Sequence, residues 1–180
     1  VARNAIDRLP LLEAVERMEQ VFVGPLNPER EIELGLFKLR IPQYPIEGVR
    51  EAVLNALTHR DYLNPGEILV RHSAQELVVT SPGGFVAGIT PENILRHEAV
   101  PRNRTLANAL VKLRLVESSG IGRRRIFRSA LVYGKRRPQY QTDGYTVTLR
   151  LFNRETHSAV AQVAARLDAA GAVVTLDHLL

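Results

Sequence analysis

Three residues with chemically useful side chains, Glu51, Asn55 and His59, recur at intervals of four in a stretch that is otherwise largely apolar. At about 100° per residue in a helix, they fall on one face, opposite the stripe that contains Val49 and Val53. A glutamate can act as a general base, and an asparagine oxygen can bind a hard cation such as Mg²⁺. The spacing indicates a small catalytic or cation-binding face, with a merely solvated polar face as the alternative. For the lone His59, a hydrogen bond at the helix end is the preferred interpretation over a metal site.

Two pairs of glycines could bring backbone N–H groups close to an anion. Gly83 and Gly84 follow a predicted strand, and successive N–H groups there can form an anion-binding nest. Gly120 and Gly122 open a predicted helix whose first turn carries Arg123, so free N–H groups, the helix dipole and positive charge would converge on a phosphate. A plain turn and a flexible helix start are the alternatives. Neither pair matches a Walker A loop or a Rossmann fingerprint.

Positive charge is concentrated in the middle of the chain. The net charge is +5, and residues 62–154 carry 15 basic against 6 acidic residues. No acidic residue lies between Glu117 and Asp143. That window predicts an anionic partner, either nucleotide phosphate or the backbone of nucleic acid, with a solvated basic face as the alternative. The candidate contacts for DNA phosphates in this window are Arg124, Arg125, Arg128, Lys135, Arg136 and Arg137.

The composition excludes several classes of protein. Of the 180 residues, 45% are hydrophobic and 24% are charged, which predicts one soluble globular domain with appended helices. The lack of cysteine excludes disulfide frameworks, zinc fingers and thiol catalysis, and it suits a cytoplasmic protein. No apolar run approaches the roughly 18 residues that a membrane-spanning helix needs, so no membrane partner is expected. The start with Val rather than Met predicts an excised fragment.

These residues need helices and a sheet to position them. Hydrophobic periodicity predicts helices over residues 9–22, 46–60, 105–116 and 121–133, and strands over residues 67–73, 75–81 and 145–151. The alternation across residues 32–41 changes phase near Gly35, which predicts one strand with a bulge. Thr90 followed by Pro91 predicts the start of a short helix.

Several motifs follow one another in an order that is more specific than any of them alone. They are Tyr44-Pro45, Arg50-Glu51-Ala52 through Asn55-Ala56 to His59-Arg60-Asp61-Tyr62, Ser81-Pro82-Gly83-Gly84, Val100-Pro101-Arg102-Asn103 and Gly120-Ile121-Gly122-Arg123-Arg124. On these motifs, residues 1–154 resemble the C-terminal domain of the RecG-related, helicase-like transcriptional regulators. That family is distantly similar to the GHKL ATPases. No helicase motif is present in the sequence.

This resemblance implies an α/β (α+β) fold, a two-layer sandwich in which helices pack on a mixed, mostly antiparallel sheet, with ATP between the layers and a helical C-terminal extension. It also implies roles for individual residues: water activation by Glu51, Mg²⁺ binding by Asn55, adenine contacts by Gly83 and Gly84, and phosphate contacts by Gly120 and Gly122, beside Arg123. GHKL proteins use an Asp ahead of the first glycine pair to bind the adenine amino group. The corresponding stretch here reads Val79-Thr80-Ser81.

Under the same resemblance, residues 1–154 form the domain, with residues 1–30 as a helical lead-in, and residues 155–180 begin a truncated winged-helix segment. We therefore expect a nucleotide-binding regulatory domain, or a degenerate form of one, in a cytoplasmic DNA-binding transcriptional regulator. Two alternatives stay open. One is a noncatalytic scaffold that forms homo-oligomers and contacts the DNA backbone through its basic helix. The other is a working Mg²⁺-dependent ATPase.

Overall fold

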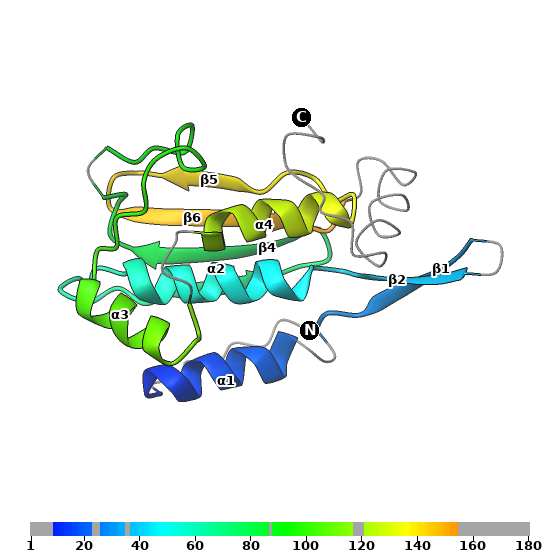
Figure 1. Ribbon diagram of the computed structural model, residues 1–180, viewed down its shortest axis with the longest axis horizontal. Coiled ribbons are helices and arrows are strands. Elements are labelled where there is room, and N and C mark those ends of the chain that lie inside the picture. Colours follow the sequence, from blue (N-terminus) through cyan, green and yellow to red (C-terminus); the bar gives the residue numbers. More distant parts are fainter. Residues whose placement is uncertain (1–8, 23–25, 35–36, 87, 117–120, 155–180) are drawn as a thin grey trace.

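Figure 1 shows the computed structural model of the chain, which describes residues 9–22, 26–34, 37–86, 88–116 and 121–154. The predicted winged-helix start, residues 155–180, lies outside the described residues. In chain order the elements are α1 (Leu11–Phe22), β1 (Glu29–Leu34), β2 (Phe37–Pro42), α2 (Ile46–His59), β3 (Leu69–His72), β4 (Glu76–Pro82), α3 (Arg104–Lys112), α4 (Ile121–Val132), β5 (Gln139–Thr142) and β6 (Thr146–Phe152). Among the described helices, none has the length and apolar character needed to cross a bilayer.

A four-stranded sheet forms one layer of the domain. Its strands lie in the order β3-β4-β6-β5, and every neighbouring pair is antiparallel. Helices α2 and α4 lie side by side across one face of this sheet, and α1 packs against α2 (Figure 1). The predicted α+β sandwich is therefore confirmed, and the part of the sheet that the structure describes is antiparallel throughout.

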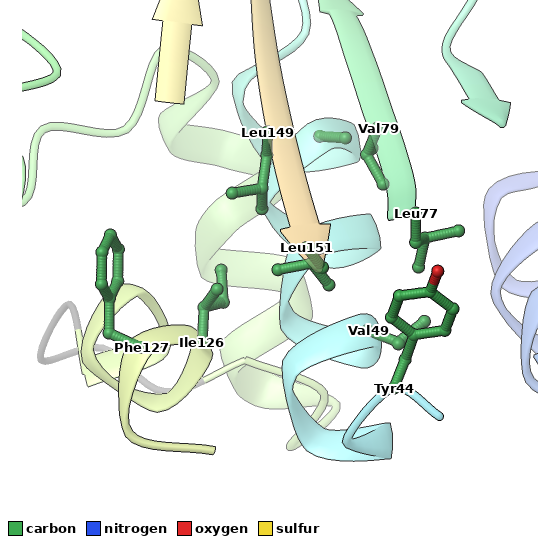
Figure 2. Packing of buried hydrophobic residues seen from close by; sticks show 10 residues of the cluster. Tyr44, Val49, Leu77, Val79, Ile126, Phe127, Leu149 and Leu151 are labelled. Carbon is green, nitrogen blue, oxygen red and sulfur yellow. The ribbon is translucent and has the colours of Figure 1, made fainter. Parts of the chain in front are cut away.

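The core lies between the sheet and the two central helices (Figure 2). Successive residues of a strand point to opposite faces, so residues two apart on β4 and β6 enter the core together. The buried residues that meet there are Val49, Ala52 and Ala56 from α2, Ile126 and Phe127 from α4, and Leu77, Val79, Leu149 and Leu151 from the sheet. This packing fixes α2 and α4 relative to the central strands.

Tyr44 anchors the start of α2. Its side chain is fully buried, its O–H donates to the carbonyl of Ser73 at 3.0 Å, and burial raises its pKa to about 12. Its backbone N–H and carbonyl bond the side-chain amide of Asn27 at 2.7 and 2.8 Å. Pro45 follows as the N-cap position of the helix. The Tyr44-Pro45 motif thus determines where α2 begins.

A hairpin stands where one strand with a bulge near Gly35 was predicted. β1 and β2 pair antiparallel, from Glu29 opposite Pro42 to Leu34 opposite Phe37. The prediction of a single strand was wrong because apolar alternation changes phase at a bulge and at a chain reversal alike. Figure 1 shows the hairpin extending away from the four-stranded sheet.

Two other elements also differ from the predictions. No helix follows Thr90, where residues 91–96 form turns, although Thr90 and Asn93 exchange two hydrogen bonds typical of a helix cap. Strand β5 was not predicted because it is a short edge strand whose residues are polar and exposed except for the half-buried Tyr140. Buried helices and strands show a periodic pattern of apolar residues in the sequence. The segment after Thr90 and the edge strand β5 both lack this pattern.

Gly48 allows α2 and α4 to approach closely, since a Cβ there would lie 2.6 Å from Ser129 Oγ. We expect Gly48→Ala to lower the free energy of unfolding by about 1–2 kcal/mol, net of the gain in helix propensity. Urea unfolding measures this loss. Ser129→Ala removes the clashing atom, so the double variant should recover most of the stability. A double variant as unstable as Gly48→Ala would contradict the close contact.

Candidate functional site

A cavity of about 450 Å³ lies between α2, the sheet, and the segment that runs from β4 to the start of α4. Small-molecule sites typically enclose roughly 300–1,000 Å³. Apolar side chains from α2, α3, β4, β6 and the connection between β4 and α3 form most of the wall. The polar and charged side chains that line it belong to Glu51, Asn55, Thr58, His59, Ser81, Asn108, Lys112, Arg123 and Tyr140.

This cavity brings together the residues predicted for the nucleotide site that the structure describes. Those residues are Glu51, Asn55, Gly83, Gly84, Gly122 and Arg123, which come from three separate stretches of the chain. Gly120 lies outside the described residues. The helix face inferred from spacing and the glycines inferred from phosphate chemistry therefore border one space.

Glu51 is buried rather than solvated, so the alternative of a solvated polar face is wrong for this residue. Its residue exposure is 4%, and its Oε1 accepts a hydrogen bond from Arg125 Nη1 at 3.2 Å. Its other oxygen, Oε2, lies against Gly122, where a Cβ would overlap it. The ion pair compensates the cost of burying the carboxylate, and the glycine leaves room for it beside the first turn of α4.

Asn55 lies one turn further along α2. Its side-chain Nδ2 is buried and has no hydrogen-bond partner among the described residues. Leaving such an atom unpaired costs on the order of 1–3 kcal/mol, which a bound ligand would recover. Within the described part of the chain, no group of three or more His, Asp or Glu could hold a metal ion. A cation at Asn55 would take its remaining ligands from water and phosphate oxygens, as Mg²⁺ usually does.

The carboxyl end of α2 is capped by the Val-Pro-Arg-Asn motif. Arg102 donates from Nε to the carbonyl of His59 at 3.1 Å and from Nη2 to the carbonyl of Gly84 at 2.6 Å. Asn103 Nδ2 donates to the carbonyls of Thr58 and Arg60 at 2.9 and 2.7 Å. These two side chains were not predicted as site residues, since hydrogen bonds to distant carbonyls leave no local pattern in a sequence.

The Ser-Pro-Gly-Gly loop is shaped by close contacts within the protein. Gly83 has a φ of +96°, and a Cβ there would lie 2.8 Å from the Cβ of Asp61. At Gly84, a Cβ would overlap the carbonyl of Gly144. The Gly83 N–H donates to the carbonyl of Tyr145 at 2.7 Å, so it is not available to an anion nest. The glycines line the cavity because the loop must pass close to its neighbours.

Arg123 spans the gap between α4 and the connection that leads to α3. Its Nη2 donates to the carbonyl of His97 at 2.9 Å, and burial lowers the pKa of its guanidinium. Arg123 therefore lines the cavity and also holds the connection between β4 and α3 at His97.

The predicted DNA contacts do not form one exposed set. Those with exposed side chains are Arg124, Arg136 and Arg137, and Arg128 is half-buried. Arg125 is bonded to Glu51, and Lys135 is 3% exposed and donates to the backbone and side-chain oxygens of Asn153 at 3.2 and 3.3 Å. Burial takes Lys135 out of reach of a DNA backbone. The sequence does not indicate this burial, because the partner of Lys135 is Asn153, which follows β6 and lies 18 residues further along the chain.

Comparison with known proteins gives a family match that includes part of the cavity lining. Residues 66–151 match the family model described as "Putative ATP-dependent DNA helicase recG C-terminal". The resemblance to the RecG C-terminal domain is confirmed. This match also supports an ATPase-like fold, and it includes the Ser-Pro-Gly-Gly loop and the first turn of α4.

A solved structure has a similar fold. It is the crystal structure of the DIP2311 protein from Corynebacterium diphtheriae, with a TM-score of 0.76 and 33% sequence identity. The match covers 84% of this chain and 31% of that chain, so the sequence spans about a third of the DIP2311 chain. A search of curated proteins found no match.

Replacing Arg125 with Gln would leave the Glu51 carboxylate buried without its cation. We expect the free energy of unfolding to fall by about 1–3 kcal/mol, a range reduced by the partial exposure of the Arg125 side chain. Urea unfolding would measure the loss. Arg124→Gln, at the exposed neighbouring position, is the matched control and should change stability by less than about 0.5 kcal/mol. Equal losses in the two variants would contradict the assigned pairing.

Proposed function

We propose that the cavity binds an adenine nucleotide together with Mg²⁺, in a regulatory domain of a cytoplasmic DNA-binding transcriptional regulator. The observation that carries the proposal is the meeting of Glu51, Asn55 and Gly122 at one part of the cavity, beside the first turn of α4. The match to the RecG C-terminal family supports it. The proposal includes one domain over residues 1–154 and a winged-helix start over residues 155–180.

The phosphate chain of the nucleotide is assigned to the first turn of α4. N–H groups in a first helical turn have no partner within the helix and attract anions. A Cβ at Gly122 would fill the space beside Glu51 and Asn55, so the glycine keeps this part of the cavity open. Arg123 adds a positive charge at the same turn. Bound Mg²⁺ would neutralise phosphate oxygens, and the side-chain oxygen of Asn55 is the atom that would hold it. The unpaired buried Nδ2 of the same amide would donate to a phosphate oxygen.

The nucleobase is assigned to the apolar part of the cavity beside Gly83 and Gly84. In place of an acceptor carboxylate, the preceding strand offers Ser81, whose hydroxyl donates to the carbonyl of Ala56 at 2.9 Å. Only the hydroxyl oxygen is left to accept a hydrogen bond from a base amino group. A neutral acceptor forms a weaker hydrogen bond than a carboxylate, which favours a degenerate, weakly binding form of the site.

Glu51 is the residue that would activate water in a working ATPase. Its Oε1 is bonded to Arg125, and its Oε2 faces Gly122. The Arg125 contact fixes the carboxylate on the phosphate side of the cavity. Hydrolysis is the narrower form of the proposal, and binding without hydrolysis is the broader one.

Calorimetric titration of the chain with ADP and ATP, with and without Mg²⁺, tests nucleotide binding. In Asn55→Ala we expect affinity to fall at least about fivefold when Mg²⁺ is present and to change little when it is absent, because the lost amide acts through the cation. Asn64→Ala is the control, since that side chain bonds the Gly66 N–H in a loop outside the cavity. Undetectable binding at millimolar nucleotide would overturn the proposal. Mg²⁺-dependent turnover lost in Glu51→Gln would identify a working ATPase.

The exposed arginines favour a second function, in which the domain serves as a scaffold that contacts the DNA backbone. Replacing Arg124, Arg136 and Arg137 together with Gln should weaken binding to duplex DNA at low salt and reduce the slope of log affinity against log salt by up to about 3. Fluorescence anisotropy measures both quantities. Arg40→Gln, on the hairpin, is the control for loss of charge alone. An unchanged slope in the triple variant would leave these arginines as a solvated surface.

A further inference from the structure

Tyr140 is the half-buried residue of the edge strand β5, whose other residues are exposed. It lines the cavity, and the function proposed above gives it no role. We propose that Tyr140 is a ligand-binding residue whose hydroxyl donates a hydrogen bond to a phosphate group of the bound nucleotide. This inference rests on the proposed nucleotide binding and extends it to a strand that the glycine and Asn55 patterns do not include.

The sheet directs Tyr140 toward the helices. Tyr140 lies opposite Leu149 of β6, and Leu149 belongs to the core between the sheet and the central helices. Residues directly opposite each other in an antiparallel pair point to the same face, so Tyr140 packs against that core as well. Its neighbours Gln139 and Gln141 point to the other face and are exposed. Strand geometry therefore brings one polar group of β5 to the cavity.

Two aromatic contacts fix the Tyr140 ring. It stacks on Phe127 of α4, with the ring centroids 6.2 Å apart and the planes inclined by 21°. Phe85, which follows Gly84 and also lines the cavity, lies with its centroid 6.1 Å away at an angle of 55°. Offset and tilted pairs of this kind are favourable arrangements of aromatic rings. The ring is thus packed within the protein, which leaves the hydroxyl as the group that needs a polar partner.

The Tyr140 hydroxyl is a donor without an acceptor in the protein. Among the described residues, no hydrogen bond uses it, and the charged groups that act on it electrostatically are Arg123 and Glu51. Burial raises the pKa of this hydroxyl, so it keeps its proton at neutral pH and can donate. Buried polar groups are nearly always hydrogen-bonded, so a ligand that supplies an acceptor here is favoured.

The charges beside the hydroxyl favour a phosphate over the nucleobase. Glu51 faces Gly122 in the first turn of α4, and Arg123 is the next residue of that turn, to which the phosphate chain is assigned. The Glu51 carboxylate is already paired with Arg125. A phosphate oxygen can accept from both the Tyr140 hydroxyl and the Arg123 guanidinium, and hydrogen bonds to an ionised acceptor are roughly twice as strong as neutral ones. The uncharged adenine ring would gain less beside Arg123.

Tyr140→Phe tests the inference, because it removes the hydroxyl and keeps the ring that packs on Phe127. Binding of ADP and of adenosine is followed by NMR titration of the 180-residue chain with Mg²⁺ present. In Tyr140→Phe we expect the affinity for ADP to fall about tenfold and the affinity for adenosine to change less than twofold. Tyr145→Phe is the matched control, because Tyr145 is 79% exposed and absent from the cavity lining.

A second readout follows the hydroxyl itself. In protein with carbon-13 in the tyrosine rings, the Cζ signal that Tyr140→Phe removes belongs to Tyr140. This signal should shift when ADP binds and stay nearly unchanged when adenosine binds, because the Cζ atom carries the hydroxyl and responds to its hydrogen bond. Urea unfolding of Tyr140→Phe shows whether the packing of the ring is retained.

Three results contradict the inference. Equal losses for ADP and adenosine in Tyr140→Phe would assign the hydroxyl to the base or to the shape of the cavity. Unchanged ADP affinity in this variant would remove the hydroxyl from the site and leave the proposed function intact. Wild-type protein that binds neither compound at millimolar concentration would overturn the proposed function and this inference with it.

Discussion

Helix α2 is buried along most of its length after Gly48, so the polar side chains on its buried faces must be paired within the fold or face the cavity. Glu51 is paired with Arg125, and the Thr58 hydroxyl donates to the carbonyl one turn earlier at 2.7 Å. Asn55 and His59 instead border the cavity. Burying polar groups without partners costs free energy, so the polar groups of α2 that have no partner in the fold favour a ligand or water in this space.

The motifs that are widely separated in the sequence meet around the carboxyl end of this helix. The Asp61 N–H donates to the carbonyl of Pro82 at 2.8 Å, and Arg102 bonds the carbonyls of His59 and Gly84. The loop after α2, the Ser-Pro-Gly-Gly loop and the connection before α3 are thereby held as one unit. Each of these segments satisfies backbone groups that another one exposes.

Apolar periodicity predicted the four helices and the two central strands, because these elements each present a stripe to one core. The same periodicity also placed Glu51 and Asn55 on a common face, which depends only on helix geometry. It failed for β5, which lies at the sheet edge and buries little apolar surface, and for the hairpin, whose phase change has two structural meanings.

Long-range hydrogen bonds account for the other differences. Lys135 belongs to a basic run, yet it is buried because Asn153 supplies two acceptors for its ammonium group. Arg102 and Asn103 cap a helix that ends more than forty residues earlier. The sequence favoured a helix-end hydrogen bond for His59, but Arg102 and Asn103 already bond the carbonyls of residues 58–60. Such pairings join residues that are distant in sequence, so no local pattern encodes them.

Arg123 links the cavity to the backbone of the connection between β4 and α3. A guanidinium is a rigid plane with five N–H donors, and Arg123 uses one of its nitrogens to hold the backbone at His97. An anion bound to the remaining N–H donors of Arg123 would be linked through the guanidinium to the backbone at His97. Occupancy of the cavity and stiffness of the connection between β4 and α3 would then change together. A ligand bound to Arg123 would in this way act on the backbone at His97, a residue outside the cavity lining.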